Sequence, residues 1–568
     1  MSDQDTGVLK YQHPGRGRGR AKSAPKGRQA DPAAIREIAG LLGDRPRRRD
    51  LLIEFLHLVQ DAFGHLSAMH LAALADELAL SLTEVYEVAT FYAHFDVAKE
   101  DDVAPPQLTV RVCDSLSCAL AGGAELLSQL QSRLSPAVRV VRAPCVGRCD
   151  TAPVADVGHH GIARADVAKV AEACAKLRVH PEPPRHKDLK AYRADGGYSL
   201  LASCRDLRRP VENLMTELER AELRGLGGAG FPAGRKWRAV RAEAGPRLVA
   251  VNADEGEPGT FKDRYFLETD PHRVLEGMLI AAWAVEAQEI YFYLRDEYPA
   301  LRHMLLHEIA GLEKAGLTGG VAVHLRRGAG AYICGEESAM LESIEGKRGL
   351  PRHKPPYPAQ VGLFGRPTLI HNVETLYWVR DIAEKGAAWW LGHGRNGRTG
   401  LRSFSVSGRV ASPGVKIAPA GITMRELLDE YCGGMLPGHR FKAYLPGGAS
   451  GGILPASMAD IPLDFGTLEK YGCFIGSAAI VVMSDRDNMR EAALNLMRFF
   501  EDESCGQCTP CRVGTEKAVA LMQERVWNEA LLDELSAAMR DASICGLGQA
   551  APNPLASVLK YFRGDIAG

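Results

Sequence analysis

The sequence lacks any run of about eighteen apolar residues, the minimum for a transmembrane helix. Its first residues also lack the apolar core of a signal peptide, which favours a cytoplasmic location. Nor does one sign of charge dominate, because 69 Lys and Arg residues face 70 Asp and Glu residues and leave a formal net charge of −1. No global field therefore draws the chain to nucleic acid or to a membrane surface. We expect a cytoplasmic protein that binds neither.

The chain is long and rich in cysteine. Its 568 residues, 46% of them hydrophobic, can bury several cores, and at about 150 residues per domain they predict three or four domains. Thirteen cysteines are present. In a reducing cytosol, so many cysteines point to metal or redox chemistry more than to disulfides.

Residues 1–30 differ from the rest, because they are rich in Gly, Arg and Lys and have almost no apolar side chains. Such a segment cannot bury enough surface to offset the entropy lost on ordering. A basic tail can bind nucleic acid, but we favour a flexible arm that docks on an acidic partner subunit or stays disordered.

Hydrophobic spacing predicts helices first and a small α/β unit second. From about Asp31 to Phe95 the apolar residues recur at helical spacing, and Ser81–Glu84 is typical of a capping box. The prolines of Val179–Asp188 indicate a linker. The elements expected before this linker are strands at Leu108–Val112 and Ala137–Val141 and helices near Ala124–Leu134 and Asp166–Leu177.

A larger α/β region follows and runs to about Trp378. Its expected strands are Arg247–Asn252, Glu289–Leu294 and Val321–Leu325. From about Leu401 to Ile461, short strands and glycine turns around one helix suggest a compact β-grasp-like insert. The remaining sequence is helical again.

Two pairs of cysteines follow the two strands of the small α/β unit. Cys113 and Cys118 form C-x4-C after the first strand, and Cys145 and Cys149 form C-x3-C after the second. Both pairs are therefore expected on loops at one end of a sheet, where four thiolates can converge. The C-x4-C spacing favours a [2Fe–2S] cluster. Structural zinc is an alternative, and two disulfides are a less favoured one.

Residues 503–514 read ESCGQCTPCRVG and place Cys505, Cys508 and Cys511 at two-residue gaps. Cys545 follows later, in SICGLG. Three close cysteines and one remote cysteine suit a cubane [4Fe–4S] cluster. The other cysteines are interpreted as small buried hydrophobes without a role, namely Cys174, Cys204, Cys334, Cys432 and Cys473.

Glycine-rich stretches and clustered carboxylates suggest bound nucleotides. Arg224–Trp237 contains RGLGGAGFPAGRKW, whose bare backbone amides can approach a phosphate. Four polar residues of Asn252–Glu257 crowd one strand-to-loop corner, where ribityl or ribose hydroxyls are natural donors. A structural turn, a solvated acidic turn and a metal site are the plainer alternatives for each stretch alone. A second glycine loop, which ends in Glu336 and Glu337, makes a flavin and a dinucleotide together the favoured interpretation.

These motifs resemble those of one family. GAGFP, NADEGEPGTFKDR, GAGAYICGEES, KPPYPAQ, HNVET and ESCGQCTPCR are similar to the NADH-binding flavoprotein subunit of respiratory complex I and its relatives, from about Asp195 onward. Residues 31–180, including VATFY, resemble the separate thioredoxin-like [2Fe–2S] subunit of the same family. The chain thus resembles a natural fusion of the two subunits.

The resemblance implies a multidomain α/β fold with FMN, NAD, one [2Fe–2S] cluster and one [4Fe–4S] cluster. The predicted parts are a disordered basic tail (1–30), a helical segment (31–102), a thioredoxin-like [2Fe–2S] domain (103–180), a linker (181–195), a Rossmann-like FMN- and NAD-binding α/β domain (196–385), a ubiquitin-like β-grasp domain (386–475) and a helical bundle with the [4Fe–4S] cluster (476–568).

The resemblance also implies site residues. Those for FMN are Gly225, Gly227, Gly228, Lys236, Asn252, Asp254, Glu255, Tyr332, Gly335, Glu336, Asn372 and Thr375. Those for NAD are Phe231, Glu257, Glu337, Lys354 and Tyr357. Hydride transfer would be performed by FMN, so no side chain is expected to be catalytic. Three positions depart from the family's pattern, since Leu226 and His371 stand where Arg and Asn are usual and Tyr357 replaces a usual Phe.

A chain of this kind implies a partner subunit, because it has no terminal electron donor of its own besides NAD(H). EIYFYLRDEYP, ESIEGKRGLPRHKPPYPAQ and the fused layout are most similar to the β subunit of soluble NAD-dependent formate dehydrogenases, whose partner carries molybdenum or tungsten. The alternatives are the fused diaphorase subunit of an NAD-reducing hydrogenase, where the N-terminal cysteines are often incomplete, and a fused NADH-oxidising module of complex I. A scaffold or regulatory module without turnover is disfavoured by the intact loops and eight ligand cysteines.

Overall fold

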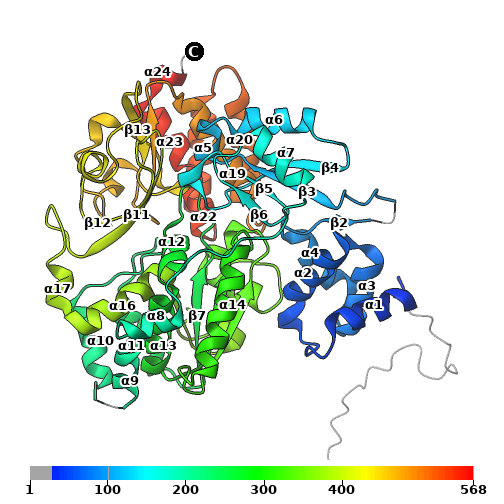
Figure 1. Ribbon diagram of the computed structural model, residues 1–568. Helices are drawn as coiled ribbons and strands as arrows, with labels where there is room; N and C mark the ends of the chain where they lie inside the picture. The colour runs from blue at the N-terminus through cyan, green and yellow to red at the C-terminus, as the bar shows by residue number, and fades with distance from the viewer. Residues whose placement is uncertain (1–27, 100, 207, 567–568) are drawn as a thin grey trace, which may run out of the picture.

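The computed structural model describes residues 28–99, 101–206 and 208–566, so most of the predicted basic tail (1–30) lies outside the described residues. The described part of the chain forms four sheets surrounded by helices (Figure 1). None of the helices in this described part is both long enough and apolar enough to cross a lipid bilayer.

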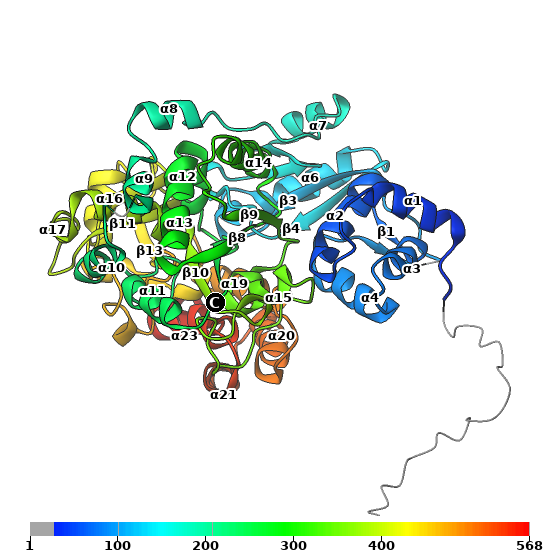
Figure 2. The same cartoon turned by 90° about the horizontal axis from the view of Figure 1, so that it is seen from below.

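Four helices come first and form what we call the N-terminal helical segment. They are α1 (Pro32–Leu42), α2 (Leu52–Phe63), α3 (Ala68–Glu77) and α4 (Leu82–Phe91). Short parallel strands, β1 (Leu66–Ser67) and β2 (Val97–Ala98), close the segment. The predicted capping box is confirmed, because Ser81 and Glu84 exchange both side-chain-to-backbone hydrogen bonds at the start of α4. In Figure 2 these helices form one end of the molecule.

The next unit, which we call the cysteine-loop unit, has a four-stranded sheet in the order β4-β3-β5-β6. Strands β3 and β4 are parallel, with Cys113 opposite Ala143, so the loops that follow them leave from the same edge. The expectation that both cysteine pairs lie at one end of a sheet is thereby confirmed. The elements are β3 (Leu108–Cys113), α5 (Leu116–Leu120), α6 (Gly123–Arg133), β4 (Val138–Ala143), β5 (Ala155–Val157), β6 (His160–Ile162) and α7 (Val167–Ala175).

The central unit contains a parallel sheet in the order β10-β7-β8-β9. Three of its strands follow the sequence expectation closely: β7 (Arg247–Ala253), β8 (Ala287–Leu294) and β9 (Ala322–Arg327). β10 (Thr368–Asn372) was not expected, because a five-residue stretch that carries His and Asn has little strand character of its own. Pairing along β7 holds it in the sheet.

Helices cover both faces of this sheet (Figure 1). They are α8 (Leu189–Ala194), α9 (Ser199–Arg205), α10 (Val211–Arg220), α11 (Ala233–Ala242), α12 (Lys262–Thr269), α13 (Pro271–Val285), α14 (Pro299–Lys314), α15 (Glu337–Ile344), α16 (Val373–Lys385) and α17 (Ala387–Leu391). The segment from residue 176 to residue 188, between α7 and α8, has no helix or strand, which suits the predicted linker.

A five-stranded unit follows, with the strand order β12-β11-β15-β13-β14. Its first and last strands, β11 and β15, are parallel neighbours at the centre, which is the β-grasp arrangement. The elements are β11 (Leu401–Gly408), β12 (Gly414–Pro419), α18 (Met424–Glu426), β13 (Phe441–Leu445), β14 (Leu454–Pro455) and β15 (Ala479–Ser484). The central strand β15 lies beyond residue 475, so this sheet includes residues past the predicted end of the β-grasp domain.

The C-terminal helices carry the second group of cysteines. They are α19 (Met489–Asp502), α20 (Thr509–Gln523), α21 (Glu529–Ala542), α22 (Gly546–Ala550), α23 (Asn553–Tyr561) and α24 (Arg563–Ile566). The three-cysteine turn joins α19 to α20, and Cys545 directly precedes α22. Because α20 and α21 pack against each other, the turn and Cys545 can meet at one end of this helical unit.

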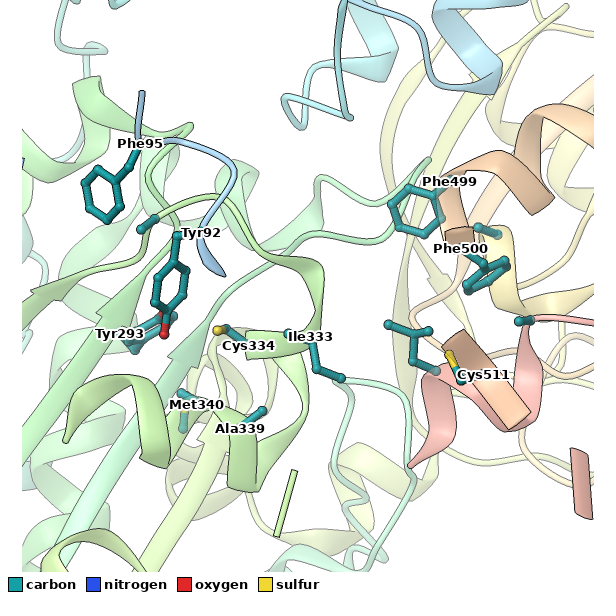
Figure 3. Packing of buried hydrophobic residues seen from close by; sticks show 14 of the residues in the cluster. Tyr92, Phe95, Tyr293, Ile333, Cys334, Ala339, Met340, Phe499, Phe500 and Cys511 are labelled. Atoms are coloured by element: carbon teal, nitrogen blue, oxygen red, sulfur yellow. The ribbon is translucent and has the colours of Figure 1, made fainter. Parts of the chain in front are cut away.

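The units share one hydrophobic core. A single cluster of buried residues runs from the N-terminal helical segment through the central unit into the C-terminal helices. Tyr92, at the end of α4, lies beside Tyr293 and Cys334 of the central unit (Figure 3). Its hydroxyl lies 2.8 Å from the carbonyl oxygen of Lys347 and 2.9 Å from the Ser343 hydroxyl. The N-terminal helical segment is therefore docked on the central unit by buried contacts.

Candidate functional site

A cavity of about 340 Å³ opens at the carboxyl ends of β7 and β10, where α/β folds commonly bind ligands. Nine of the twelve residues expected to contact FMN line it: Gly227, Gly228, Asn252, Asp254, Glu255, Tyr332, Gly335, Glu336 and Asn372. The other three, Gly225, Lys236 and Thr375, are not part of the lining. The structure therefore gathers most of this predicted set around one space.

The glycine-rich loop folds back on itself beside the cavity. The Gly225 amide donates to the Phe231 carbonyl at 2.8 Å. At Gly227 an added Cβ would lie 2.9 Å from Cβ of Asn372, and Gly228 has a φ of +131°. Side chains are therefore disfavoured at both positions. The result is bare backbone along one wall of the cavity.

Two of the positions that depart from the family's pattern are buried and face protein. The Leu226 amide donates to the Thr375 hydroxyl at 2.9 Å, and His371 Nε2 accepts from the indole N–H of Trp237 at 2.7 Å. Burial, and then repulsion from Lys236, hold the pKa of His371 well below its usual range, so the ring is neutral. Neither Leu226 nor His371 lines the cavity.

Asp254 provides a test of what the cavity can hold. Its Oδ2 is buried and has no hydrogen-bond partner among the described residues. Burial also raises the pKa of this carboxyl well above its usual range. A buried acceptor without a donor costs free energy, and the hydroxyls of a ribityl chain are suitable donors. The cavity therefore fits the polyol portion of a flavin mononucleotide.

Glu255, in contrast, is fully engaged by protein. Its carboxylate accepts from the amides of Asp263 at 2.8 Å and Arg264 at 3.1 Å, and from the Tyr298 hydroxyl at 3.0 Å. Burial, together with repulsion from Asp263, raises its pKa to about 7. Glu255 thus holds the corner between β7 and α12 in place, with an acid that titrates near neutral pH.

Lys262 also lines the cavity, although no role was expected for it. It is 1% exposed, and its Nζ lies 2.8 Å from Asp263 and 3.1 Å from Glu374. The signal was present in the motif NADEGEPGTFKDR, where a lysine and an aspartate start α12. Nothing in that stretch indicated that Lys262 would be buried, because Glu374 comes from the distant α16.

The remaining walls come from units for which the sequence indicated no chemistry. Ser450 donates its amide and hydroxyl to Glu257, at 2.7 and 2.6 Å. The only sequence signal there is the glycine-rich stretch 447–452. The further lining residues from these units are Phe474, Gly476, Ser477, Gly546, Leu547 and Ala550. Residues from the five-stranded unit and from the start of α22 therefore enclose the cavity.

The residues expected to hold NAD fall into two places. Glu257 lies on the cavity wall, held by Ser450 and by the Tyr332 hydroxyl at 2.5 Å. Glu337 instead joins an ion-pair network, 2.8 Å from Lys354 and 3.5 Å from Lys236. Burial opposes ionisation of Glu337, but the two lysines hold its pKa below the usual range.

Two aromatic side chains of the NAD set are exposed. Phe231 is 48% exposed and Tyr357 is 56% exposed, which is unusual for residues of this size. Phe231 directly follows the glycine-rich loop, and Arg235 lies 6.0 Å from the centre of its ring. Exposed aromatic faces beside a glycine loop can stack on a planar ring of a ligand.

The first four cysteines lie in one buried pocket, and we call them the inner set. Cys113, Cys118, Cys145 and Cys149 are at most 3% exposed, and the sulfurs of Cys145 and Cys149 are 3.3 Å apart. Hydrogen bonds from Cys113 and Cys149 hold the pKa of Cys145 well below the usual thiol range. Four convergent sulfurs of this kind match the donor set of an iron–sulfur cluster.

The second four cysteines, which we call the outer set, are less enclosed. Cys511 is buried, whereas Cys505, Cys508 and Cys545 are half-buried. Burial and the neighbouring thiols raise the pKa of Cys511 and of Cys545 to about 11. Cys508 and Cys545 each stand at the start of a helix, where backbone amides favour anionic sulfur. This set also matches the four-sulfur donors of a cluster.

Buried arginines join the inner set to the cavity. Arg295 donates to the carbonyl of Cys145 at 2.5 Å and also to the carbonyl of Glu255. Arg264 donates to the carbonyl of Gly147 at 2.8 Å and pairs with Asp150 at 2.9 Å. Through these contacts the loops of the cysteine-loop unit rest directly on the wall of the cavity.

The other five cysteines, Cys174, Cys204, Cys334, Cys432 and Cys473, are all buried. Their interpretation as small apolar side chains agrees with this burial. All thirteen cysteines lie in the described residues as free thiols, which leaves no disulfide in that part of the chain.

Three family descriptions match consecutive parts of the sequence. Residues 38–178 match the thioredoxin-like [2Fe-2S] ferredoxin, residues 218–381 match the Nuo51 FMN-binding domain, and residues 491–567 match the NADH-ubiquinone oxidoreductase-F iron-sulfur binding region. The chain therefore has domains for FMN, a [2Fe–2S] cluster and a [4Fe–4S] cluster. In the N-terminal part, this finding favours a [2Fe–2S] cluster over zinc.

Relatives agree with these matches. The second F-type component of the NADH-quinone oxidoreductase of Rhizobium meliloti (strain 1021) is 42% identical over 393 residues, which are 66% of this chain and 93% of the relative. The corresponding NADH-quinone oxidoreductase component of Aquifex aeolicus (strain VF5) is 40% identical over 400 residues, 68% and 92% of the two chains.

The solved structure of an NAD+-reducing [NiFe]-hydrogenase in the H2-reduced state is similar over 92% of both chains, at 31% identity and a TM-score of 0.79. This similarity extends over the fused N-terminal parts as well. The chain belongs to the F-type family of NADH-quinone oxidoreductase components and is an NAD-linked flavin and iron–sulfur oxidoreductase subunit that carries its thioredoxin-like [2Fe–2S] domain on the same polypeptide.

Proposed function

We propose that this chain is the NADH-dehydrogenase (diaphorase) subunit of a cytoplasmic, NAD-dependent formate dehydrogenase. A partner subunit with molybdenum or tungsten oxidises formate, and this chain carries the electrons to NAD+. The observation that carries the proposal is the complete inner set of four cysteines, fused to the flavin-binding unit and buried against it. In the related NAD-reducing hydrogenase subunits these N-terminal cysteines are often incomplete, and the wording of the motifs is most similar to formate dehydrogenase β subunits.

We assign FMN to the cavity, the [2Fe–2S] cluster to the inner set and the [4Fe–4S] cluster to the outer set. When bound, FMN exchanges a hydride with nicotinamide and single electrons with iron–sulfur clusters. The chain's own residues bind and orient. Asp254 offers an unpaired acceptor to a ribityl hydroxyl, and the bare loop at Gly227 and Gly228 lets the ligand approach the backbone. Ser450 and Phe474 help to close the cavity against water.

Cluster content tests the assignment of the cysteines. Two complete sets of four predict about six irons per chain, two in the inner set and four in the outer set. Iron and acid-labile sulfide, measured after anaerobic purification, should both approach this value. Stoichiometric zinc with little iron would overturn it.

Nucleotide choice tests the assignment of the NAD residues. Glu337 carries a negative charge that Lys354 and Lys236 only partly balance, and Glu257 adds a second carboxylate on the cavity wall. If either carboxylate faces the adenosine ribose, a 2′-phosphate is repelled, so NAD should be preferred over NADP. The measurement is kcat/KM for both nucleotides, and equal values would refute the assignment.

The partner is identified by what purifies with the untagged chain. Metal analysis should find molybdenum or tungsten, and extraction should yield a pterin cofactor. Formate should then reduce NAD+ in the assembled complex. A complex that contains nickel and reduces NAD+ with hydrogen would contradict the formate assignment without touching the flavin and cluster assignments.

The second candidate is the diaphorase subunit of an NAD-reducing hydrogenase, which the similarity to a solved structure of that class favours. A fused NADH-oxidising module of complex I is a third arrangement, consistent with the NADH-quinone oxidoreductase relatives. A scaffold without turnover is excluded if NADH bleaches the flavin of the isolated chain, because bleaching requires working nucleotide and flavin sites.

A further inference from the structure

Two histidines and an aspartate meet where the N-terminal helical segment rests on the central unit. His57 lies on α2, His94 lies after α4, and Asp296 lies in the loop after β8. Each offers one ligand atom, and these atoms lie within 4.8 Å of one another. We propose that His57, His94 and Asp296 form a binding site for a divalent transition-metal cation of the zinc class, separate from the flavin cavity and from both cysteine sets.

His57 carries the first observation. Its Nε2 lies 2.7 Å from the carbonyl oxygen of Gly328, which can only accept, so Nε2 bears the proton. Nδ1 is then an acceptor, and it is buried without a hydrogen-bond partner in the described part of the chain. Histidine ligands of metals typically donate their second ring N–H to a backbone carbonyl. The His57 ring, 2% exposed, therefore has the tautomer and the free lone pair of a metal ligand.

Asp296 carries the second observation. One carboxylate oxygen accepts from the Nε of Arg327, and the other lies 2.7 Å from Nδ1 of His94. A carboxylate that ligates a metal is commonly fixed in this way through its other oxygen. A bound cation would take the place of the proton that His94 and Asp296 share. Metal–ligand bonds of about 2.0–2.1 Å require ligand atoms about 3.3 Å apart, so this pair would open slightly.

The surrounding charges favour a cation. Arg327 is the nearest positive group, but it is shared between Asp296 and Asp61, 2.9 Å from the latter. His159 lies beyond Asp61, at 3.8 Å. Two imidazoles and one carboxylate are borderline ligands that zinc accepts readily. His94 and Asp296 also line a cleft of about 320 Å³, from which water can complete the coordination.

Such a cation would link the N-terminal helical segment to the central unit, because its ligands come from both. Metal binding by a folded site adds to folding stability. Without a cation, the same groups would form only a hydrogen-bonded contact between the two parts. Metal binding distinguishes the two cases.

The experiment uses the full chain with its clusters and FMN, purified anaerobically, mixed with one equivalent of Zn²⁺ and desalted. Wild-type protein should retain about one zinc per chain in addition to its iron. The variants His57→Gln and His94→Gln should bind zinc at least about 100-fold more weakly, beyond what loss of a supporting residue costs. His324→Gln, a half-exposed histidine on β9 paired with Glu289, should bind as wild type does.

Zinc-edge X-ray absorption separates this site from zinc bound by cysteine, and iron does not interfere. Nitrogen and oxygen neighbours only are expected. A sulfur shell, no zinc retained by wild type, or equal affinity in His57→Gln would overturn the proposal. Iron and FMN content verify that each variant is folded, and the absorption spectrum of wild type remains decisive if a variant is not.

Discussion

The two cysteine sets differ in how much protein surrounds them. Every cysteine of the inner set is at most 3% exposed, and its loops are held by Arg264 and Arg295 of the central unit. In the outer set only Cys511 is buried, and the turn lies at the edge of the C-terminal helices. A redox group near the surface can approach a partner, whereas one enclosed between two units cannot. The difference assigns the outer set to exchange with a partner and the inner set to the interior of the molecule.

The largest expected effect breaks this comparison at its functional end. In Cys508→Ala the outer cluster loses a ligand, and cluster loss should loosen the adjoining start of α20. Formate-driven NAD+ reduction by the assembled complex should fall by more than about 100-fold, beyond the cost of losing a supporting residue. NADH should still bleach the flavin, and a small artificial acceptor should still be reduced, because the cavity belongs to other elements.

The matched variant is Cys118→Ala in the inner set. It should remove the [2Fe–2S] signal while formate-driven NAD+ reduction continues, since the inner set lies off the proposed route. Both activities are measured on one preparation with FMN content confirmed. If Cys508→Ala retained near-wild-type formate activity, the outer cluster would not be the obligatory link.

A pair of glycines compares the packing of the two sets. Gly147, between two inner cysteines, has a φ of +69°, and an added Cβ would meet the ring of Tyr298. Gly506, between two outer cysteines, has a φ of +76°, but the nearest atom would be 4.0 Å away. Gly147→Ala should destabilise by about 3–5 kcal/mol, from overpacking plus strain. Gly506→Ala should cost only the strain, about 1–2 kcal/mol.

Thermal unfolding and the intensity of each cluster's paramagnetic signal measure this difference. Loss of the [2Fe–2S] signal in Gly147→Ala, with the [4Fe–4S] signal kept in Gly506→Ala, is expected. Equal losses in the two variants would mean that the inner loop has room the structure does not show.

A third prediction concerns Glu255, on the wall between the inner set and the cavity. Its pKa is about 7 in the fold, against an ordinary value of 4.5. The neutral form is favoured in the folded state, so its stabilisation is full below about pH 4.5 and is lost as pH rises through 7. Relative to Glu255→Gln, wild-type stability should therefore fall between about pH 5 and about pH 8, by about 3 kcal/mol at most.

The measurement is the difference in thermal unfolding temperature between the two proteins across this pH range. A difference that does not change with pH would show that Glu255 is ionised throughout, held by the amides of Asp263 and Arg264 more strongly than burial opposes.

The smallest effect is expected where the two surroundings touch at the surface. Arg142, on β4, lies 3.5 Å from Asp114 and 3.9 Å from Asp502 at the end of α19, and its side chain is 57% exposed. Exposed pairs contribute about 0–1 kcal/mol and are screened by salt. Arg142→Ala should lower stability by less than about 1 kcal/mol, with no further change in high salt. A larger loss would indicate that the two sets are coupled along this edge.

Local signals carried much of this site. Cysteine spacing, the glycine loops and the capping box at Ser81 depend on a few neighbouring residues, so a single stretch of sequence is enough to recognise them. The strands β7 and β8 were also recognisable, because buried parallel strands are continuous apolar runs.

What sequence reasoning missed depends on distant contacts. Lys262 is buried only because Glu374, from α16, lies 3.1 Å away. Ser450 reaches the cavity because the five-stranded unit folds against the central one, and its own stretch shows only glycine turns. β10 is a strand because β7 offers an edge. In each case the partner is more than a hundred residues away along the chain, so no local pattern could reveal it.

The segment that connects α7 to α8 has a consequence for assembly. The NADH-quinone oxidoreductase relatives match only 66–68% of this chain. Here a short tether joins the two walls of the inner set and keeps them at an effective concentration on the order of millimolar, however dilute the protein is. Covalent connection thereby takes over the task of affinity. The interface between the two units can drift in sequence, or open and reclose around its cluster, without the halves ever being lost to each other.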